Sequence, residues 1–167
     1  MPVLRDLKSW QSCDPGPYRQ YLVIERGGRK GFGVLPGVHT LFAVGWLGSE
    51  VSSIGRIPEP CIDRLVEAYE RGLIFLDEDL AQWRCLVCPE RDGPDGVIDT
   101  IEWKGREVDI VAWGNHAILH ADNIYVCPAF ILHYILRHQY RPPNMFQRAL
   151  TEGRFLSKDD LVFAKRQ

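Results

Sequence analysis

The stretch Val126-Cys-Pro-Ala-Phe-Ile-Leu-His-Tyr-Ile-Leu-Arg-His-Gln-Tyr-Arg-Pro-Pro143 decides the fold, because it predicts a strand end, a short helix and a stop. Pro128 suits the first turn of a helix, where its missing N–H is no loss. Pro142 keeps the residue before it out of the helical region. The stretch therefore predicts a helix over about 128–138.

The predicted helix is apolar on nearly every side. At 100° per residue, its polar stripe consists of Ala129, His133 and Arg137. A helix of this kind packs in a core, so His133 faces the one direction in which a polar partner can lie. His138 lies about 140° from His133 around a regular helix, so we expect the two histidines not to share a ligand and His138 to cap the helix C-terminus.

Patterns on both sides of this stretch predict the other elements. An amphipathic helix over about 60–71 is bounded by Pro60 and Gly72, and a third helix over 144–152 ends before Gly153. Alternating segments predict a hairpin across Lys104-Gly105 and two further strands before the central helix. We therefore expect an α+β fold, in which a buried helix (about 128–138) and an amphipathic helix (about 60–71) pack on a largely antiparallel sheet.

Composition sets the broad class. A chain of 167 residues with 46% hydrophobic and 25% charged residues fits a single domain over 1–167, with partly ordered ends at 1–19 and 154–167. A formal net charge of −2 gives no general attraction for nucleic acid, which we do not expect as a partner. The N-terminus lacks a signal-peptide layout and no apolar run reaches membrane-spanning length, so we expect a cytoplasmic protein without membrane contact.

The cysteines indicate a metal site or reduced thiols rather than a disulfide framework, since they are five in number and no export signal accompanies them: Cys13, Cys61, Cys85, Cys88 and Cys127. In Cys85-x-x-Cys88, two thiolates in one turn can hold a tetrahedral zinc from one side. Residues that can supply the other side are His116, His120, Cys127, His133 and His138.

One combination completes a closed zinc site. Cys127 and His133 lie near the start of the central helix, so Cys85, Cys88, Cys127 and His133 form a Cys3His set if the Cys-x-x-Cys turn packs there. Such a set is structural rather than catalytic, because four protein ligands leave no open position. The alternative is that the thiols are buried small hydrophobes and the histidine is a hydrogen-bonded core residue.

A second pattern suggests hydrolytic chemistry. Asp99-Thr-Ile-Glu102-Trp-Lys104 contains the Glu-x-Lys of metal-dependent nucleases, in which carboxylates hold magnesium and a lysine stabilises the transition state. With His133, these residues form the candidate catalytic set. The alternative is a surface charge cluster, because Lys104 occupies an apparent hairpin turn.

Several short motifs together resemble a family of small, uncharacterised bacterial proteins: Gly45-Trp46-Leu47, Cys85-Leu-Val-Cys88, Gly114-Asn115 with Ile118, and His133-Tyr134-Ile135-x-x-His138-x-Tyr140-x-Pro142-Pro143-x-x-Phe146. The last motif is the specific one. The resemblance covers about residues 43–150 and implies a compact, cytoplasmic, bacterial protein.

These observations favour a non-enzymatic protein that binds another protein, as immunity-type or defence-associated proteins do. The sequence offers no complete catalytic set, its net charge is −2, and its aromatic residues include five tryptophans suited to anchoring a protein interface. The alternative is a small metal-dependent hydrolase or nuclease. No cofactor is expected other than a structural zinc ion.

Overall fold

The computed structural model describes residues 9–11, 23–37, 39–47, 51, 53–75, 85, 87–88 and 96–163. Its helices are α1 (Glu59–Glu70), α2 (Ile131–Arg137), α3 (Asn144–Glu152) and the 3-10 helix η3 (Lys158–Asp160). Its strands are β1 (Ser9–Gln11), β2 (Val23–Arg26), β3 (Arg29–Val34), β4 (Thr40–Ala43), β5 (Val97–Trp103), β6 (Arg106–Val111), β7 (Asn115–His120), β8 (Asn123–Pro128), β9 (Arg154–Phe155) and β10 (Val162–Phe163). The predicted α+β class is confirmed.

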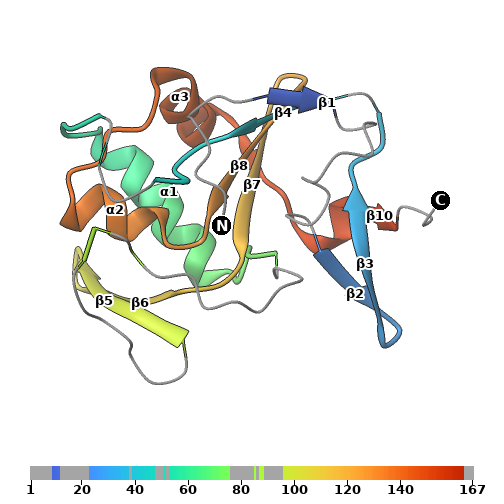
Figure 1. The fold of residues 1–167 in the computed structure, drawn as a ribbon, viewed down its shortest axis with the longest axis horizontal. Coiled ribbons are helices and arrows are strands. Elements are labelled where there is room, and N and C mark those ends of the chain that lie inside the picture. Colours follow the sequence, from blue (N-terminus) through green and yellow to red (C-terminus); the bar gives the residue numbers. More distant parts are fainter. Residues whose placement is uncertain are drawn as a thin grey trace.

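A mixed sheet forms the centre of the molecule, with the strand order β1-β4-β8-β7-β9 (Figure 1). β8 pairs antiparallel with β7, as expected, but parallel with β4. The predicted hairpin across Lys104-Gly105 is present as β5 and β6, which form a two-stranded sheet of their own. A third sheet has the order β10-β3-β2.

Strand β8 is buried on both faces, which explains its continuous apolar sequence. Tyr125 and Cys127 point into the apolar cluster that also contains residues of α1, α2 and α3. Ile124 and Val126 point to the opposite cluster, which contains Ile24 of β2. The helices therefore cover one face of the central sheet, and the β2-β3-β10 sheet covers the other (Figure 1).

Proline and glycine set the helix boundaries. α1 follows Pro58 and is succeeded by Gly72 in the left-handed region, and α3 ends before Gly153, all close to expectation. The expected start of the central helix at 128 is wrong, because Pro128 is the last residue of β8, paired with Asn115, and α2 begins at Ile131. Proline is tolerated there because it ends the strand.

The expected partly ordered ends fall only partly within the described residues. Cys13 lies outside them with most of 1–19, of which Ser9–Gln11 is described as β1. Residues 154–163 form β9, η3 and β10. None of the helices in the described part of the chain has the length and apolar character needed to span a bilayer.

Candidate metal centre

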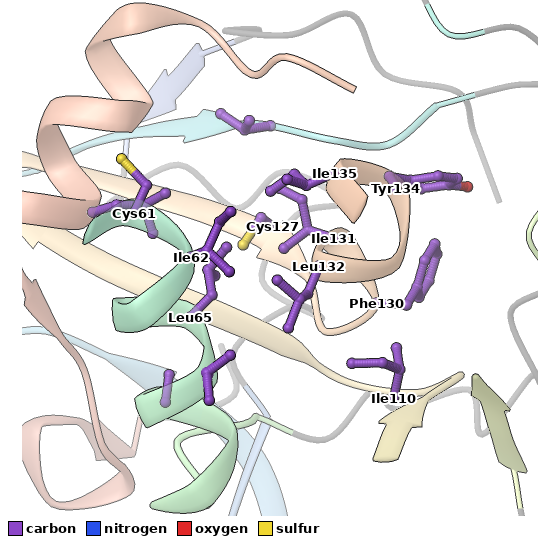
Figure 2. Packing of buried hydrophobic residues seen from close by; sticks show 14 of the residues in the cluster. Cys61, Ile62, Leu65, Ile110, Cys127, Phe130, Ile131, Leu132, Tyr134 and Ile135 are labelled. Atoms are coloured by element: carbon purple, nitrogen blue, oxygen red, sulfur yellow. The ribbon is translucent and has the colours of Figure 1, made fainter. Parts of the chain in front are cut away.

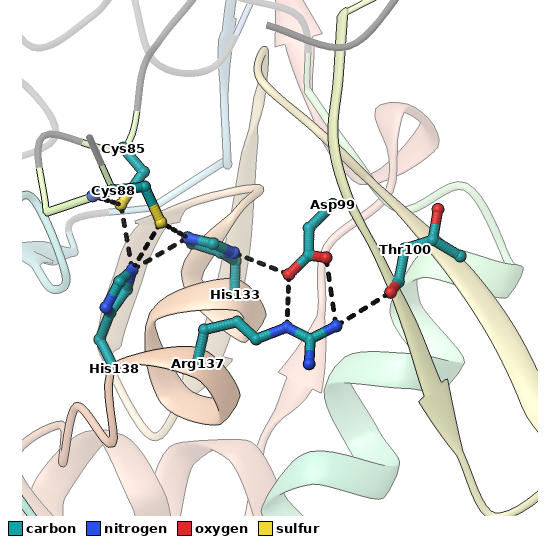
Figure 3. A network of polar contacts seen from close by, with 7 residues as sticks. All are labelled: Cys85, Cys88, Asp99, Thr100, His133, Arg137 and His138. Carbon is teal, nitrogen blue, oxygen red and sulfur yellow. Dashed lines mark hydrogen bonds and ion pairs between the residues drawn. The ribbon is translucent and has the colours of Figure 1, made fainter. Parts of the chain in front are cut away.

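Four side chains from two distant parts of the chain converge on one point, and we call them the Cys2His2 group: Cys85, Cys88, His133 and His138 (Figure 3). Their ligand atoms all lie within 4.8 Å of one another. The Nε2 atom of His138 is 3.3 Å from Cys85 Sγ and 3.2 Å from Cys88 Sγ. The Nε2 atom of His133 is 3.5 Å from Cys88 Sγ and 3.1 Å from the Nε2 atom of His138.

These separations match those of ligands around a single ion. With Zn–N and Zn–S bonds of ordinary length, tetrahedral geometry places two nitrogens about 3.3 Å apart and a nitrogen and a sulfur about 3.5 Å apart. Two imidazole nitrogens that face each other at 3.1 Å also require a proton or a cation between their lone pairs. The group therefore has the composition and spacing of a metal site.

The Cys-x-x-Cys turn contains a hydrogen bond that favours a thiolate, although burial keeps the pKa of Cys85 above its ordinary value. The backbone N–H of Cys88 donates to Cys85 Sγ at 3.4 Å, an interaction that favours the charged sulfur. Burial raises the pKa of the Cys85 thiol, while hydrogen bonds from the backbone of Cys88 and Val87 oppose the rise. A bound cation stabilises the thiolate further, because a coordinating thiol is deprotonated.

The expectation that the two histidines point apart is wrong. The rotation of 100° per residue applies only within the helix, and α2 ends at Arg137. His138 occupies the C-cap position, with φ −111° and ψ 6°, but its backbone N–H makes the capping bond to Tyr134 while its side chain points to the cysteines, and Gln139 has φ 53°. This break brings the His138 ring back to His133, with the ring centroids 4.9 Å apart. The signal that the sequence offers is the His-x4-His spacing, which is typical of Cys2His2 zinc sites.

The structure does not bring Cys127 into this group. It lies on β8 opposite His116 and belongs to the apolar cluster beneath α1 and α2 (Figure 2). Complete burial raises the pKa of its thiol well above the ordinary value. Strand alternation is the reason, because Cys127 shares the face of Tyr125.

The other histidines considered as ligands also lie elsewhere. His116 donates from Nδ1 to the carbonyl oxygen of Leu73 at 2.8 Å. His120 lies at the other end of β7, where its Nε2 is 3.2 Å from a carboxylate oxygen of Glu152. Within the described residues, Cys85, Cys88, His133 and His138 form the group that meets the geometric requirement for a metal.

On its other side, His133 contacts a buried carboxylate. Its Nδ1 is 2.9 Å from Asp99 Oδ2, and since an ionised carboxylate only accepts, Nδ1 carries the proton and donates (Figure 3). Arg137 donates from Nε to the same oxygen at 2.8 Å. Burial raises the pKa of Asp99, but the hydrogen bonds from Arg137 and His133 outweigh it and hold the pKa below its usual value.

The candidate nuclease residues are not assembled into one site. Asp99 is buried and Glu102 is exposed, because they point to opposite faces of β5. Lys104 lies in the turn after β5, with φ 49°, and its Nζ is 2.9 Å from Asp63 and 3.2 Å from Glu59 of α1. Of this set, Asp99 and His133 are in contact.

Comparison with known proteins places the chain in a family without giving it a function. No curated protein matches the chain, and no solved structure does. One family model matches residues 12–151, a range that contains all four members of the Cys2His2 group. The chain belongs to the family described as a domain of unknown function, DUF7919.

Proposed function

We propose that this chain is a zinc-binding protein domain in which Cys85, Cys88, His133 and His138 hold one structural ion. The observation that carries the proposal is the convergence of two sulfurs and two nitrogens, which all lie within 4.8 Å of one another and of which four pairs are 3.1–3.5 Å apart. Thiolate and imidazole together favour zinc over magnesium or calcium, which prefer oxygen ligands.

The ion has a structural role in this proposal. Four protein ligands close the coordination shell, whereas catalytic zinc sites keep a position for water or substrate. The ion joins residues 85–88 to α2, two parts of the chain that are about 45 residues apart. α2 is also a core helix, with Ile131, Leu132 and Tyr134 buried, and so it is not free to enter a DNA groove as the helix of a classical zinc finger does.

We further propose that the domain acts by binding a protein partner, as an immunity-type or defence-associated protein of a bacterium, rather than by catalysis. Two points support this role. A closed metal centre provides no reaction site, and the candidate nuclease residues are separated, since Glu102 is exposed on the other face of β5 from Asp99 and Lys104 pairs with Asp63. The bacterial setting rests on the motif resemblance, of which His133-Tyr134-Ile135-x-x-His138-x-Tyr140-x-Pro142-Pro143-x-x-Phe146 is the specific part.

Metal analysis of the purified full chain tests the zinc centre. We expect about one zinc ion per chain, and we expect Cys88→Ser and His138→Asn each to lower zinc content and the free energy of unfolding by about 2 kcal/mol or more. His120→Asn and Cys61→Ala are the matched controls and should retain the ion, because both side chains lie outside the group. A metal-free protein whose unfolding is insensitive to chelator would contradict the proposal.

A further inference from the structure

The hydrogen bond between His133 and Asp99 fixes which nitrogen of the ring can bind a metal. Because Nδ1 donates to the carboxylate at 2.9 Å, the lone pair is left on Nε2, the atom that faces Cys88 and His138. Only 1% of the His133 side chain and 4% of the Asp99 side chain are exposed, so water does not compete for this contact.

Arg137 holds the carboxylate in place. Its Nε and Nη2 donate to the two oxygens of Asp99 at 2.8 and 3.2 Å, and Nη2 also donates to the carbonyl oxygen of Thr100 at 3.1 Å. Arg137 lies one helical turn after His133 on α2, so both residues reach the same carboxylate on β5 (Figure 3). The charge of Asp99 is balanced by Arg137, just as two thiolates balance the charge of a zinc ion.

We propose that Asp99, oriented by Arg137, is the positioning residue of the metal centre. It selects the Nε2-binding tautomer of His133, restrains the ring and increases the electron density that Nε2 offers to the ion. This inference rests on the proposed zinc site. It assigns to Asp99 an outer-sphere role in place of the magnesium ligation that the sequence suggested, and it connects the β5–β6 sheet to the ion through a single side chain.

Zinc affinity measured by competition with a chromophoric chelator tests the inference on the full chain. Asp99→Asn keeps the size and an acceptor oxygen but removes the charge, and we expect it to weaken zinc binding about 10- to 100-fold. Arg137→Gln should have a smaller effect in the same direction, because Asp99 keeps its bond to His133. Thr100→Val is the matched control on the same strand and should change the affinity by less than about twofold, since the Thr100 hydroxyl bonds Asp109 on β6.

Nitrogen-15 NMR of the His133 ring separates positioning from general stabilisation. In the zinc-loaded wild-type protein, we expect a protonated Nδ1 and a metal-bound Nε2, and in Asp99→Asn a faster exchange of the Nδ1 proton with water. Coordination through Nδ1 would overturn the inference even if the variant failed to fold. Wild-type protein that binds no zinc contradicts the proposed function, whereas wild-type zinc binding with an unchanged affinity of Asp99→Asn overturns this inference alone.

Discussion

His116 is a buried histidine that has a structural partner instead of a metal. It is fully buried, it donates to the Leu73 carbonyl at 2.8 Å, and its ring meets Tyr69 edge to face with the centroids 5.0 Å apart. His133 has nearly the same burial, but its Nδ1 donates to the carboxylate of Asp99. Its Nε2 faces two cysteine sulfurs and the imidazole of His138. What distinguishes a ligand from a core histidine is therefore the chemistry at the second ring nitrogen.

The pH dependence of stability should reflect the buried state of His116. Burial lowers its pKa from 6.5 to about 4, with the Leu73 hydrogen bond opposing the shift. Above pH 6.5 the ring is neutral in both states, and between pH 6.5 and 4 the unfolded state binds a proton that the folded state excludes. The contribution of His116 to the free energy of unfolding should fall over this window by about 3 kcal/mol and then stay constant below it.

Comparison with a variant isolates this effect from that of the acid-sensitive metal ligands. His116→Asn keeps a donor near the position of Nδ1 but does not titrate, so its stability should fall less steeply than that of the wild type between pH 6.5 and 4 when both are unfolded by urea. Identical profiles for the wild type and His116→Asn would contradict the prediction.

At the scale of elements, the sequence predicts boundaries where a local rule decides them. α1 and α3 agree with expectation because proline and glycine act on the backbone of their immediate neighbours. α2 begins later than predicted because Pro128 is equally suited to end a strand, and only the pairing with β7 settles which occurs. The helical rotation places His133 and Arg137 together correctly, but it fails for His138, which lies beyond the last helical residue.

Gly114 joins β6 to β7 at a point where only glycine fits. Its φ is 89°, and a Cβ there would lie 2.7 Å from the carbonyl oxygen of Phe75 and 2.5 Å from a side-chain carbon of Ile74. The next residue, Asn115, exchanges two backbone hydrogen bonds of 2.8 Å with Phe75, so the two segments cannot move apart without breaking them. Gly114→Ala should therefore destabilise the fold by about 3 kcal/mol or more, measured by urea unfolding.

Gly105 provides the matched control for this substitution. Its φ is 74°, but a Cβ built there would have no heavy atom within 4 Å. Gly105→Ala should therefore lower the free energy of unfolding only by the cost of the left-handed backbone, about 1 kcal/mol. The difference between the two variants in the loss of unfolding free energy measures the cost of the steric collision at Gly114. Equal destabilisation by the two substitutions would contradict the close approach to Phe75.

At the scale of the whole molecule, the sequence could not place the Cys-x-x-Cys turn. Cys85 and His133 are 48 positions apart, and which strand or helix the turn packs against depends on contacts that no local pattern encodes. The short distance in sequence between Cys127 and α2 favours Cys127 as a ligand, yet the alternation of β8 directs its side chain into the core. Three of the four predicted ligands are brought together, and the fourth position is filled by His138.

The arrangement of the layers predicts which elements lose stability when the ion is removed. Cys85 and Cys88 lie in the Cys-x-x-Cys turn, His133 on α2, His138 at the C-cap of α2 and Asp99 on β5, all on the helical side of the central sheet. β2 and β3 pack on the other face, around Ile24 and Leu161, and no described member of the Cys2His2 group belongs to that cluster. Chelation should therefore speed amide hydrogen exchange in α2 and β5, while the β2–β3 hairpin keeps its protection.

Hydrogen exchange followed by mass spectrometry, with and without chelator, checks this prediction on the full chain. The amide of His138, which donates to the Tyr134 carbonyl at 3.1 Å, should be among the most affected, because its own side chain is released from the ion. Cys88→Ser should reproduce the pattern without chelator. An equal rise in exchange on both faces of the sheet would contradict it, since it would mean that the ion stabilises the two layers as one cooperative unit.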